Sequence, residues 1–340
     1  MNTKPRNSLI IPIYKNEENI PDLLEALRTL YADLNGDLEV VLVVDGSPDR
    51  SGEMLRLALP SEPYASQLIM HSRNFGSFAA IRKGLESASG EFLAIMAADL
   101  QEPPELVLQF FEIMTANDAD VVLGTRTRRA DPLISRLASG LFWKAYRRWV
   151  VREMPAGGVD IFACTSRIRD NLLAMGESNT SLVSQLLWVG GRRVEVPYER
   201  RARTKGRSAW TLGRKVRYML DSVMAFSDFP IFLFLAVGAV GITITLSVMA
   251  IVLTAWLFGF ITIAGYTPVM LMISLVGSIL VFGQGIIGGY IWRANETTKQ
   301  RPSSIVSSHE RFASQSTPRH EKVVVIMKQE SKQSEGENDS

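Results

Sequence analysis

Cysteine is almost absent from this sequence of 340 residues, in which Cys164 stands alone. A single cysteine excludes an internal disulfide framework, and it is more often a small buried apolar residue than a nucleophile. A reducing compartment fits this composition. The apolar run from Leu9 to Ile13 is far shorter than the core of a secretory signal and ends at Lys15, so we expect no signal peptide.

An excess of either charge is also missing, because 37 Lys and Arg nearly balance 35 Asp and Glu. The net charge of +2 does not indicate a nucleic-acid partner. Charged residues are entirely absent from Phe229 to Trp292. A bilayer core of about 30 Å needs roughly 20 helical residues, so this stretch predicts a hairpin of two membrane spans, 230–258 and 267–292. A soluble core helix usually keeps a polar face, and neither segment has one.

Basic residues flank both predicted spans, and aromatic residues that favour the membrane interface lie near the span ends. The basic residues are Arg214, Lys215, Arg217, Arg293, Lys299 and Arg301, and the aromatic residues are Trp256, Tyr266, Tyr290 and Trp292. The basic flanks predict that the N-terminal domain and both termini are cytoplasmic. The spacings of Gly238 with Gly241 and of Gly285 with Gly288 permit close helix packing, which is compatible with a homo-oligomer.

A strongly basic segment precedes the first predicted span, with eight Lys or Arg and no acid between Arg200 and Arg217. A solvated basic face is the ordinary interpretation, but the nearby spans favour contact with anionic head groups. Apolar residues recur at helical spacing from Thr211 to Phe226, which predicts an amphipathic interface helix within 211–228. The residues after the hairpin, 293–340, hold few large apolar side chains, and we expect a disordered cytoplasmic tail.

The first 210 residues have the pattern of one α/β domain. Short apolar runs predict strands at Leu9–Tyr14, Glu39–Val44, Leu68–His71, Phe92–Ala97 and Val121–Thr125. Helical patterns lie between them, such as Pro21–Leu34, where Asn19 can cap the helix. This alternation predicts a mainly parallel sheet covered on both faces, whose ligands bind at the carboxyl ends of the strands.

Polar residues follow the carboxyl ends of four predicted strands. They are Tyr14, Asn16 and Glu17, then Asp45 and Ser47, then Arg73 and Asn74, and finally Asp99. Each group taken alone is ordinary turn chemistry, since Asp-Gly-Ser favours a turn and Asn-Phe-Gly a helix entry. Their expected position at one edge of the sheet predicts a shared binding cleft.

Longer motifs carry a resemblance to a known family. They are Ile11–Asn19, Val44–Asp49, Ser72–Gly76, Ala98–Glu105, Gly124–Arg126, Gly158–Asp160 and Tyr198–Trp210. Together they resemble the inverting family-two glycosyltransferases and, more narrowly, are similar to the polyprenyl-phosphate glycosyltransferases related to dolichol-phosphate mannose synthase. The resemblance covers residues 8–292 and implies a GT-A nucleotide-sugar-binding domain.

The resemblance also implies roles for the matched residues. Nucleotide-sugar binding is implied for Pro12, Tyr14, Asn16, Glu17, Asp45, Ser47, Arg73, Asn74 and Arg126. Asp99 and Gln101 match positions that bring Mg²⁺ or Mn²⁺ to the donor diphosphate, a task for hard oxygen ligands. Asp160 matches the proposed catalytic base. Binding of the acceptor phosphate is implied for Arg200, Arg203, Ser208 and Trp210.

One position departs from the family's pattern, which has an acid, any residue and a second acid before Leu-Gln. Ala97 replaces the first acid, so one carboxylate is missing from the expected metal site. Either Gln101, phosphate oxygens and water complete the coordination, which we favour, or the activity or its metal dependence is weakened.

The predicted reaction is transfer of a hexose, glucose or a related sugar, from a nucleotide diphosphate, UDP rather than GDP. The acceptor is a polyprenyl phosphate, undecaprenyl or dolichyl, and the product with inverted configuration serves modification of cell-envelope glycans. One alternative is a membrane scaffold that binds nucleotide sugar without turnover. Another is a processive polysaccharide synthase, although Gln185–Trp188 lacks the arginine of the Gln-x-x-Arg-Trp signature and only two spans follow.

Overall fold

The computed structural model describes residues 5–126, 153–155, 158–175, 181–201, 265–298 and 302–314, with isolated positions between 236 and 258. The predicted interface helix at 211–228 lies outside the described residues, and so do Arg203, Ser208 and Trp210. Residues 315–340 of the predicted tail also lie outside them.

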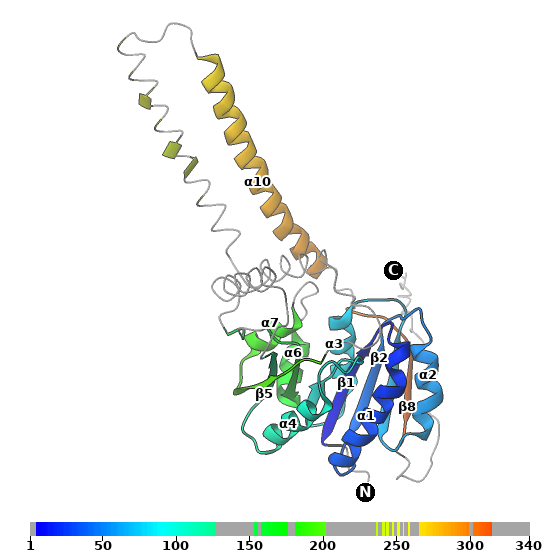
Figure 1. Ribbon diagram of the computed structural model, residues 1–340. Coiled ribbons are helices and arrows are strands. Elements are labelled where there is room, and N and C mark those ends of the chain that lie inside the picture. The colour runs from blue at the N-terminus through cyan, green and yellow to red at the C-terminus, as the bar shows by residue number, and fades with distance from the viewer. Residues whose placement is uncertain are drawn as a thin grey trace, which may run out of the picture.

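An eight-stranded sheet forms the centre of the described domain (Figure 1). Its order is β7-β5-β6-β4-β1-β2-β3-β8. The strands are β1 (Asn7–Ile13), β2 (Glu39–Val44), β3 (Ala65–His71), β4 (Phe92–Ile95), β5 (Val121–Arg126), β6 (Ile161–Thr165), β7 (Arg193–Tyr198) and β8 (Val306–Phe312). All six residues of β2 are buried, as expected for a strand that is covered on both faces.

Most of the sheet is parallel, which confirms the predicted α/β class. Strand β1 pairs in parallel with β2 and β4, β2 with β3, and β5 with β7. Strand β6 runs antiparallel to both β4 and β5, and β8 runs antiparallel to β3. The carboxyl ends of the parallel strands and the amino end of β6 therefore lie at one edge of the sheet.

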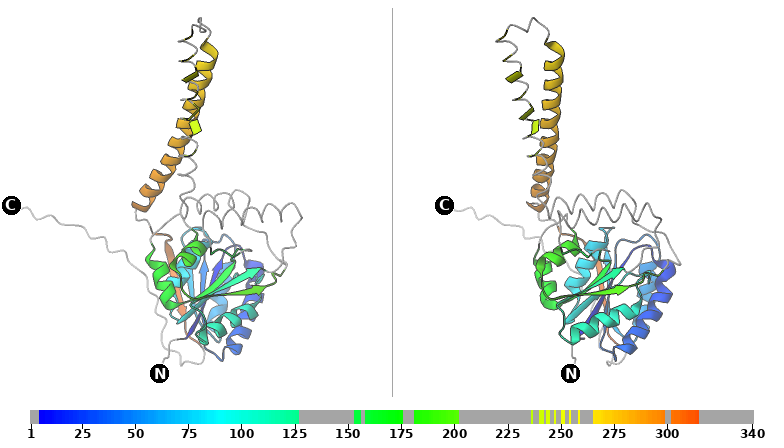
Figure 2. Two further views of the ribbon diagram at one scale, coloured as in Figure 1. Left: turned by 90° about the vertical axis from the view of Figure 1, so that its left-hand side faces the viewer. Right: turned by 60° about the vertical axis from the view of Figure 1, so that its left-hand side comes forward.

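Helices cover both faces of the sheet, and each face has its own apolar core (Figure 2). The first core lies under α1 (Ile20–Asp33), α2 (Ser51–Ala58) and α4 (Pro104–Thr115), which pack on one face. The second core lies under α3 (Ser77–Ser87), α6 (Ser166–Ala174) and α7 (Leu182–Val189), which pack on the other face. Short 3-10 turns occur at Glu17–Asn19 and Leu59–Ser61. Cys164 is fully buried in the second core, as predicted, and burial raises the pKa of its thiol to about 12.

The predicted first helix is confirmed, but the capping role of Asn19 is wrong. Pro21 lies in the first turn of α1, where its missing N–H is not needed. Asn19 already has helical backbone angles because the preceding 3-10 turn runs directly into α1, and its side chain makes no capping hydrogen bond. A cap residue normally needs an extended backbone for that bond.

The prediction of a disordered segment after the hairpin is wrong for residues 306–312, because they form β8. This strand covers the edge of β3, and the Ser72 N–H donates to the Ile305 carbonyl at 2.9 Å. Phe312 packs against the first core, while polar side chains fill much of the rest of the strand. An edge strand with an exposed side needs little apolar content, because backbone pairing supplies much of its stabilisation.

Helix α10 (Tyr266–Thr298) extends away from the sheet domain (Figure 2). It spans 33 residues, and it ends a few residues before β8. In the part of the chain that the structure describes, no helix meets the length and apolarity required of a membrane span.

We predict that Phe312→Ala lowers the free energy of unfolding by about 1 to 2 kcal/mol, because a half-buried phenyl ring leaves the core. In a domain of this size the Tm should fall by roughly 3 to 6 °C. Arg311→Ala is the matched control, since Arg311 is exposed on the same strand and should change the Tm by less than about 2 °C. Equal Tm values for both variants and the wild type would show that β8 does not stabilise the domain.

Candidate active site

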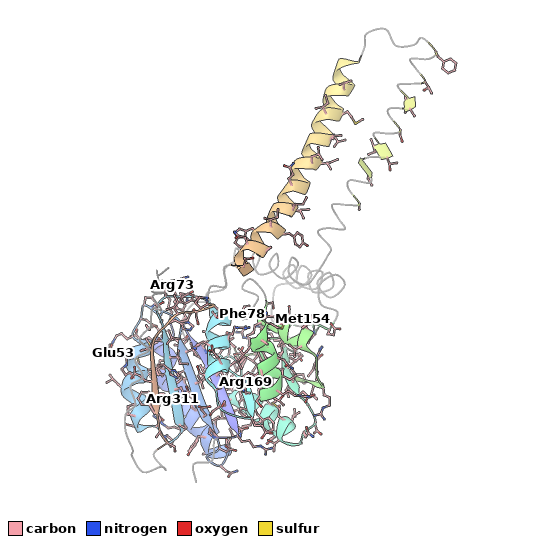
Figure 3. All side chains as sticks on the ribbon, turned by 180° about the vertical axis from the view of Figure 1, so that it is seen from behind. Glu53, Arg73, Phe78, Met154, Arg169 and Arg311 are labelled. Carbon is pink, nitrogen blue, oxygen red and sulfur yellow. The ribbon has the colours of Figure 1, made fainter. Side chains whose placement is uncertain are left out.

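Charged and polar side chains gather at the edge of the sheet where the parallel strands end. Asp45 follows β2, Asp99 follows β4, Arg126 and Tyr198 end β5 and β7, and Asp160 precedes the reversed strand β6. Figure 3 shows Arg73, in the loop after β3, at the end of the domain from which α10 extends. The predicted convergence of strand ends on one edge is therefore confirmed.

Asp45 organises the loop that follows β3. The residue is 2 % exposed, and its carboxylate accepts the N–H groups of Phe75 at 2.9 Å and Gly76 at 2.7 Å. His71 Nδ1 lies 2.8 Å from the same carboxylate. Arg73, which was predicted to bind the nucleotide, stacks on the Phe75 ring with 4.1 Å between its guanidinium carbon and the ring centre. The contact of Asp45 with a nucleotide stays a prediction, and its contacts within the protein order the loop.

Gly46 makes the close approach of two loops possible. Its φ is +56°, and a Cβ at this position would lie 2.2 Å from the carbonyl carbon of Arg73. The Asn74 side chain donates to the Asp45 carbonyl at 3.3 Å across the same contact. Only glycine fits such a position without displacing the backbone.

The loop after β1 is tied to the loop after β2. Ser47 Oγ accepts the Lys15 N–H at 2.8 Å and donates to Asp49 at 2.6 Å, and Asp49 accepts the Glu17 N–H at 3.0 Å. Burial acts to raise the pKa of Asp49, but the hydroxyl and backbone hydrogen bonds outweigh it and lower that pKa. The described contacts of Glu17 and Ser47 are thus within these loops, and nucleotide binding by Pro12, Tyr14, Asn16, Glu17 and Ser47 stays a prediction.

The loop after β4 holds the two predicted metal ligands. Leu100 has a φ of +52°, a left-handed conformation that a leucine rarely adopts and that often marks functional loops. Gln101 donates its backbone N–H to Asp99 at 3.4 Å and its side-chain N–H to the Arg201 carbonyl at 3.3 Å. Within the described ranges, no cluster of three or more His, Cys, Asp or Glu is arranged to hold a metal ion. One carboxylate and one amide carbonyl suit a hard cation that draws its other ligands from phosphate and water.

Asp160 is held by two neighbours. Arg126 donates to both of its carboxylate oxygens, through Nη2 at 2.6 Å to Oδ1 and through Nε to Oδ2. Tyr198 donates its hydroxyl to Oδ2 at 2.7 Å. Burial acts to lower the pKa of Arg126, but the hydrogen bond and charge of Asp160 raise it above its ordinary value. The role predicted for Arg126 at the donor diphosphate stays a prediction, and its described partner is the proposed base.

Arg200, predicted to bind the acceptor phosphate, pairs with the buried Glu102. Arg200 Nε lies 3.3 Å from Glu102 Oε1, and Glu102 is 1 % exposed. Burial raises the pKa of Glu102 to about 7, Arg200 opposes that rise, and the charges of Asp99 and Asp160 add to it. The pair ties the segment after β7 to the loop after β4, as does the backbone bond from the Arg201 N–H to the Gln101 carbonyl at 2.9 Å.

Three residues of this site have no role predicted from the sequence. They are His71 beside Asp45, Glu102 beside Arg200, and Tyr198 beside Asp160. Glu102 lies inside the motif Ala98–Glu105, and Tyr198 begins the motif Tyr198–Trp210, so the family resemblance of these motifs could have indicated both residues. Each contact joins residues at least 26 positions apart, which no local pattern reveals.

The mainly parallel α/β sheet, with carboxylates and arginines at its carboxyl edge, has the GT-A fold. Residues 8–162 match the model of the family described as glycosyl transferase family 2. This match supports a family-two glycosyltransferase domain over residues 8–162.

Curated relatives extend the match over most of the chain. An uncharacterised glycosyltransferase of Bacillus subtilis is 29% identical over 88% of this chain and 92% of its own length. The prophage bactoprenol glucosyl transferase homolog of Escherichia coli is 28% identical over 88% and 97%. The bactoprenol glucosyl transferase of Shigella phage SfV is 27% identical over 88% and 98%.

Solved structures are more distant. The glucosyl-3-phosphoglycerate synthase of Mycobacterium tuberculosis has 16% identity and a TM-score of 0.44, over 64% of this chain and 80% of its own. A mannosyltransferase of Pyrobaculum calidifontis in complex with GDP-Man and Mn²⁺ has 16% identity and a TM-score of 0.44, over 82% and 87%.

We predict that Gly46→Ala weakens donor binding by about 10-fold or more, because the new methyl group pushes the loop of Arg73 and Asn74 away. Gly190→Ala is the matched control: its φ is also positive, at +86°, but nothing lies within 4 Å of the added Cβ. The control should lose about 1 kcal/mol of stability and keep its donor affinity. Titration of each purified variant with nucleotide sugar measures both, and equal donor affinities would show that the loop contact does not shape the donor site.

Proposed function

We propose that this chain transfers a hexose from a nucleotide diphosphate to a polyprenyl phosphate, with inversion at the anomeric carbon. The observation that carries the proposal is the match to relatives named bactoprenol glucosyl transferase, which spans nearly all of their length. Bactoprenol is a polyprenol, so a lipid phosphate is the acceptor we infer. Glucose on UDP is the donor we propose first.

In the proposed mechanism, the acceptor oxygen attacks the anomeric carbon from the side opposite the nucleotide. Asp160 positions that oxygen or takes its proton, and Arg126 and Tyr198 hold the carboxylate in place. A phosphate acceptor is already anionic at neutral pH, so positioning carries more of the effect than proton removal. The guanidinium of Arg200 has several N–H donors, so it can bind the acceptor phosphate while Nε stays on Glu102.

The donor set fits a divalent cation held by Asp99 and Gln101, for which we propose Mg²⁺ or Mn²⁺. When bound, such a cation stabilises the negative charge that develops on the departing diphosphate. Because Ala97 supplies no side-chain oxygen, the donor phosphates would contribute a larger share of the ligands than in a site with two acids.

A lipid acceptor supports a membrane location, and we propose two spans within 229–292 with the glycosyltransferase domain on the cytoplasmic side. The support is the absence of charged residues from this stretch and the basic residues on both of its flanks. Arg73 lies at the end of the domain nearest α10, which suits a site that faces the bilayer surface (Figure 3). The spaced glycines of the hairpin support a homo-oligomer within the membrane.

The direct test is to incubate purified protein in detergent with undecaprenyl phosphate and a panel of UDP- and GDP-sugars, followed by mass spectrometry of the lipids. We expect one hexosyl phospholipid, formed from a UDP-hexose. Binding of labelled nucleotide sugar with no lipid product from any donor would favour the scaffold alternative. Long glycan chains in place of a single transferred sugar would favour the processive synthase.

We further predict that turnover requires millimolar Mg²⁺ or Mn²⁺ and stops after chelation, and that Asp99→Ala abolishes it. Ala97→Asp should tighten the apparent affinity for the cation, because an added anionic oxygen favours a divalent ion. The maximal rate need not rise, since it depends on stabilisation of the transition state. Cation titrations of the wild type and both variants separate the two parameters, and activity that survives both chelation and Asp99→Ala would remove the metal from the mechanism.

A further inference from the structure

We infer that Tyr198 is a positioning residue that sets which oxygen of Asp160 faces the acceptor. The inference rests on the proposed function, in which Asp160 is the base. It assigns a role to a residue whose ring is otherwise an ordinary member of the first apolar core.

Three strands bring the three side chains together. Arg126 and Tyr198 are the last residues of β5 and β7, and they are direct partners in the parallel register of these strands. Asp160 immediately precedes β6, which pairs with the other side of β5 so that Ile161 lies opposite Gly124. The donors to the carboxylate are thus fixed by the central sheet and not by a mobile loop, which is the arrangement that gives a site its precision.

The hydrogen bonds of the carboxylate are distributed unevenly. Oδ2 accepts from both Arg126 Nε and the Tyr198 hydroxyl, whereas Oδ1 accepts from Arg126 Nη2. A carboxylate has about four acceptor sites, two on each oxygen. Among the residues that the structure describes, these contacts fill Oδ2 and use one site of Oδ1, so Oδ1 is the oxygen with capacity for the acceptor.

The environment of Tyr198 keeps its hydroxyl in the role of donor. The residue is 6 % exposed, so its ring cannot turn away without leaving the core. Burial and the neighbouring negative charge of Asp160 raise the pKa of Tyr198, so the phenol stays protonated at neutral pH. Without this donor, Arg126 would be the one described partner left on the carboxylate, which could then pivot toward other partners.

The test is a double-mutant cycle on transfer to undecaprenyl phosphate. Tyr198→Phe keeps the ring and removes the hydroxyl, and we expect kcat to fall about 10-fold while the donor KM changes less than about twofold. Asp160→Asn should lower kcat by about 100-fold or more. In the Asp160→Asn background, Tyr198→Phe should cause no further loss, because the carboxylate that it positions is already gone.

Tyr64→Phe is the matched control. Tyr64 is fully buried in the same core, and its hydroxyl has no hydrogen-bond partner among the described residues, so its removal should leave kcat unchanged. A merely structural role of Tyr198 would lower kcat by the same factor in both backgrounds and would overturn the inference, as would a wild-type kcat in Tyr198→Phe. A wild type that transfers no sugar at all would overturn the proposed function and the inference with it.

Discussion

Strand β6 runs antiparallel to both of its neighbours, and the position of the proposed base depends on that reversal. Parallel strands present their carboxyl ends at one edge of a sheet, so a residue that precedes a further parallel strand would lie at the opposite edge. Because β6 is reversed, Asp160 precedes it at the same edge as Asp99, Arg126 and Tyr198. The sheet is buried on both faces, and this rigidity lets hydrogen bonds of ordinary length set the geometry of the site.

The carboxylates at this edge of the sheet have two different roles. Asp45 is turned inward and orders the loop that carries Arg73, whereas Asp99 and Asp160 lie at the surface of the edge. Negative charges this close to one another would repel an anionic donor and an anionic acceptor. Arginines offset them, with Arg126 on Asp160 and Arg200 on the buried Glu102, and this balance of charge suits the anionic donor and acceptor that we propose.

The sequence predicted most of the sheet, because buried parallel strands are continuous apolar runs, and β2 was placed with its observed bounds. It did not predict β6, β7 or β8. Strand β8 is stabilised by pairing with the edge of β3 and by one aromatic contact rather than by an apolar pattern. The candidate site residues were predicted one by one, from the resemblance of their motifs to a known family. The partners of those positions, such as Tyr198 for Asp160, were missed because they depend on which strands become neighbours.

The proposed function requires a single displacement at the anomeric carbon, directed by one positioned carboxylate. The anomeric configuration of the lipid product tests it most directly, measured by NMR on the hexosyl phospholipid made from an α-linked nucleotide sugar. A single displacement predicts a β-linked phosphate as the initial product. An α-linked product would require two displacements or attack on the face of the departing nucleotide, and either would contradict the role of Asp160 as the one group that positions the acceptor.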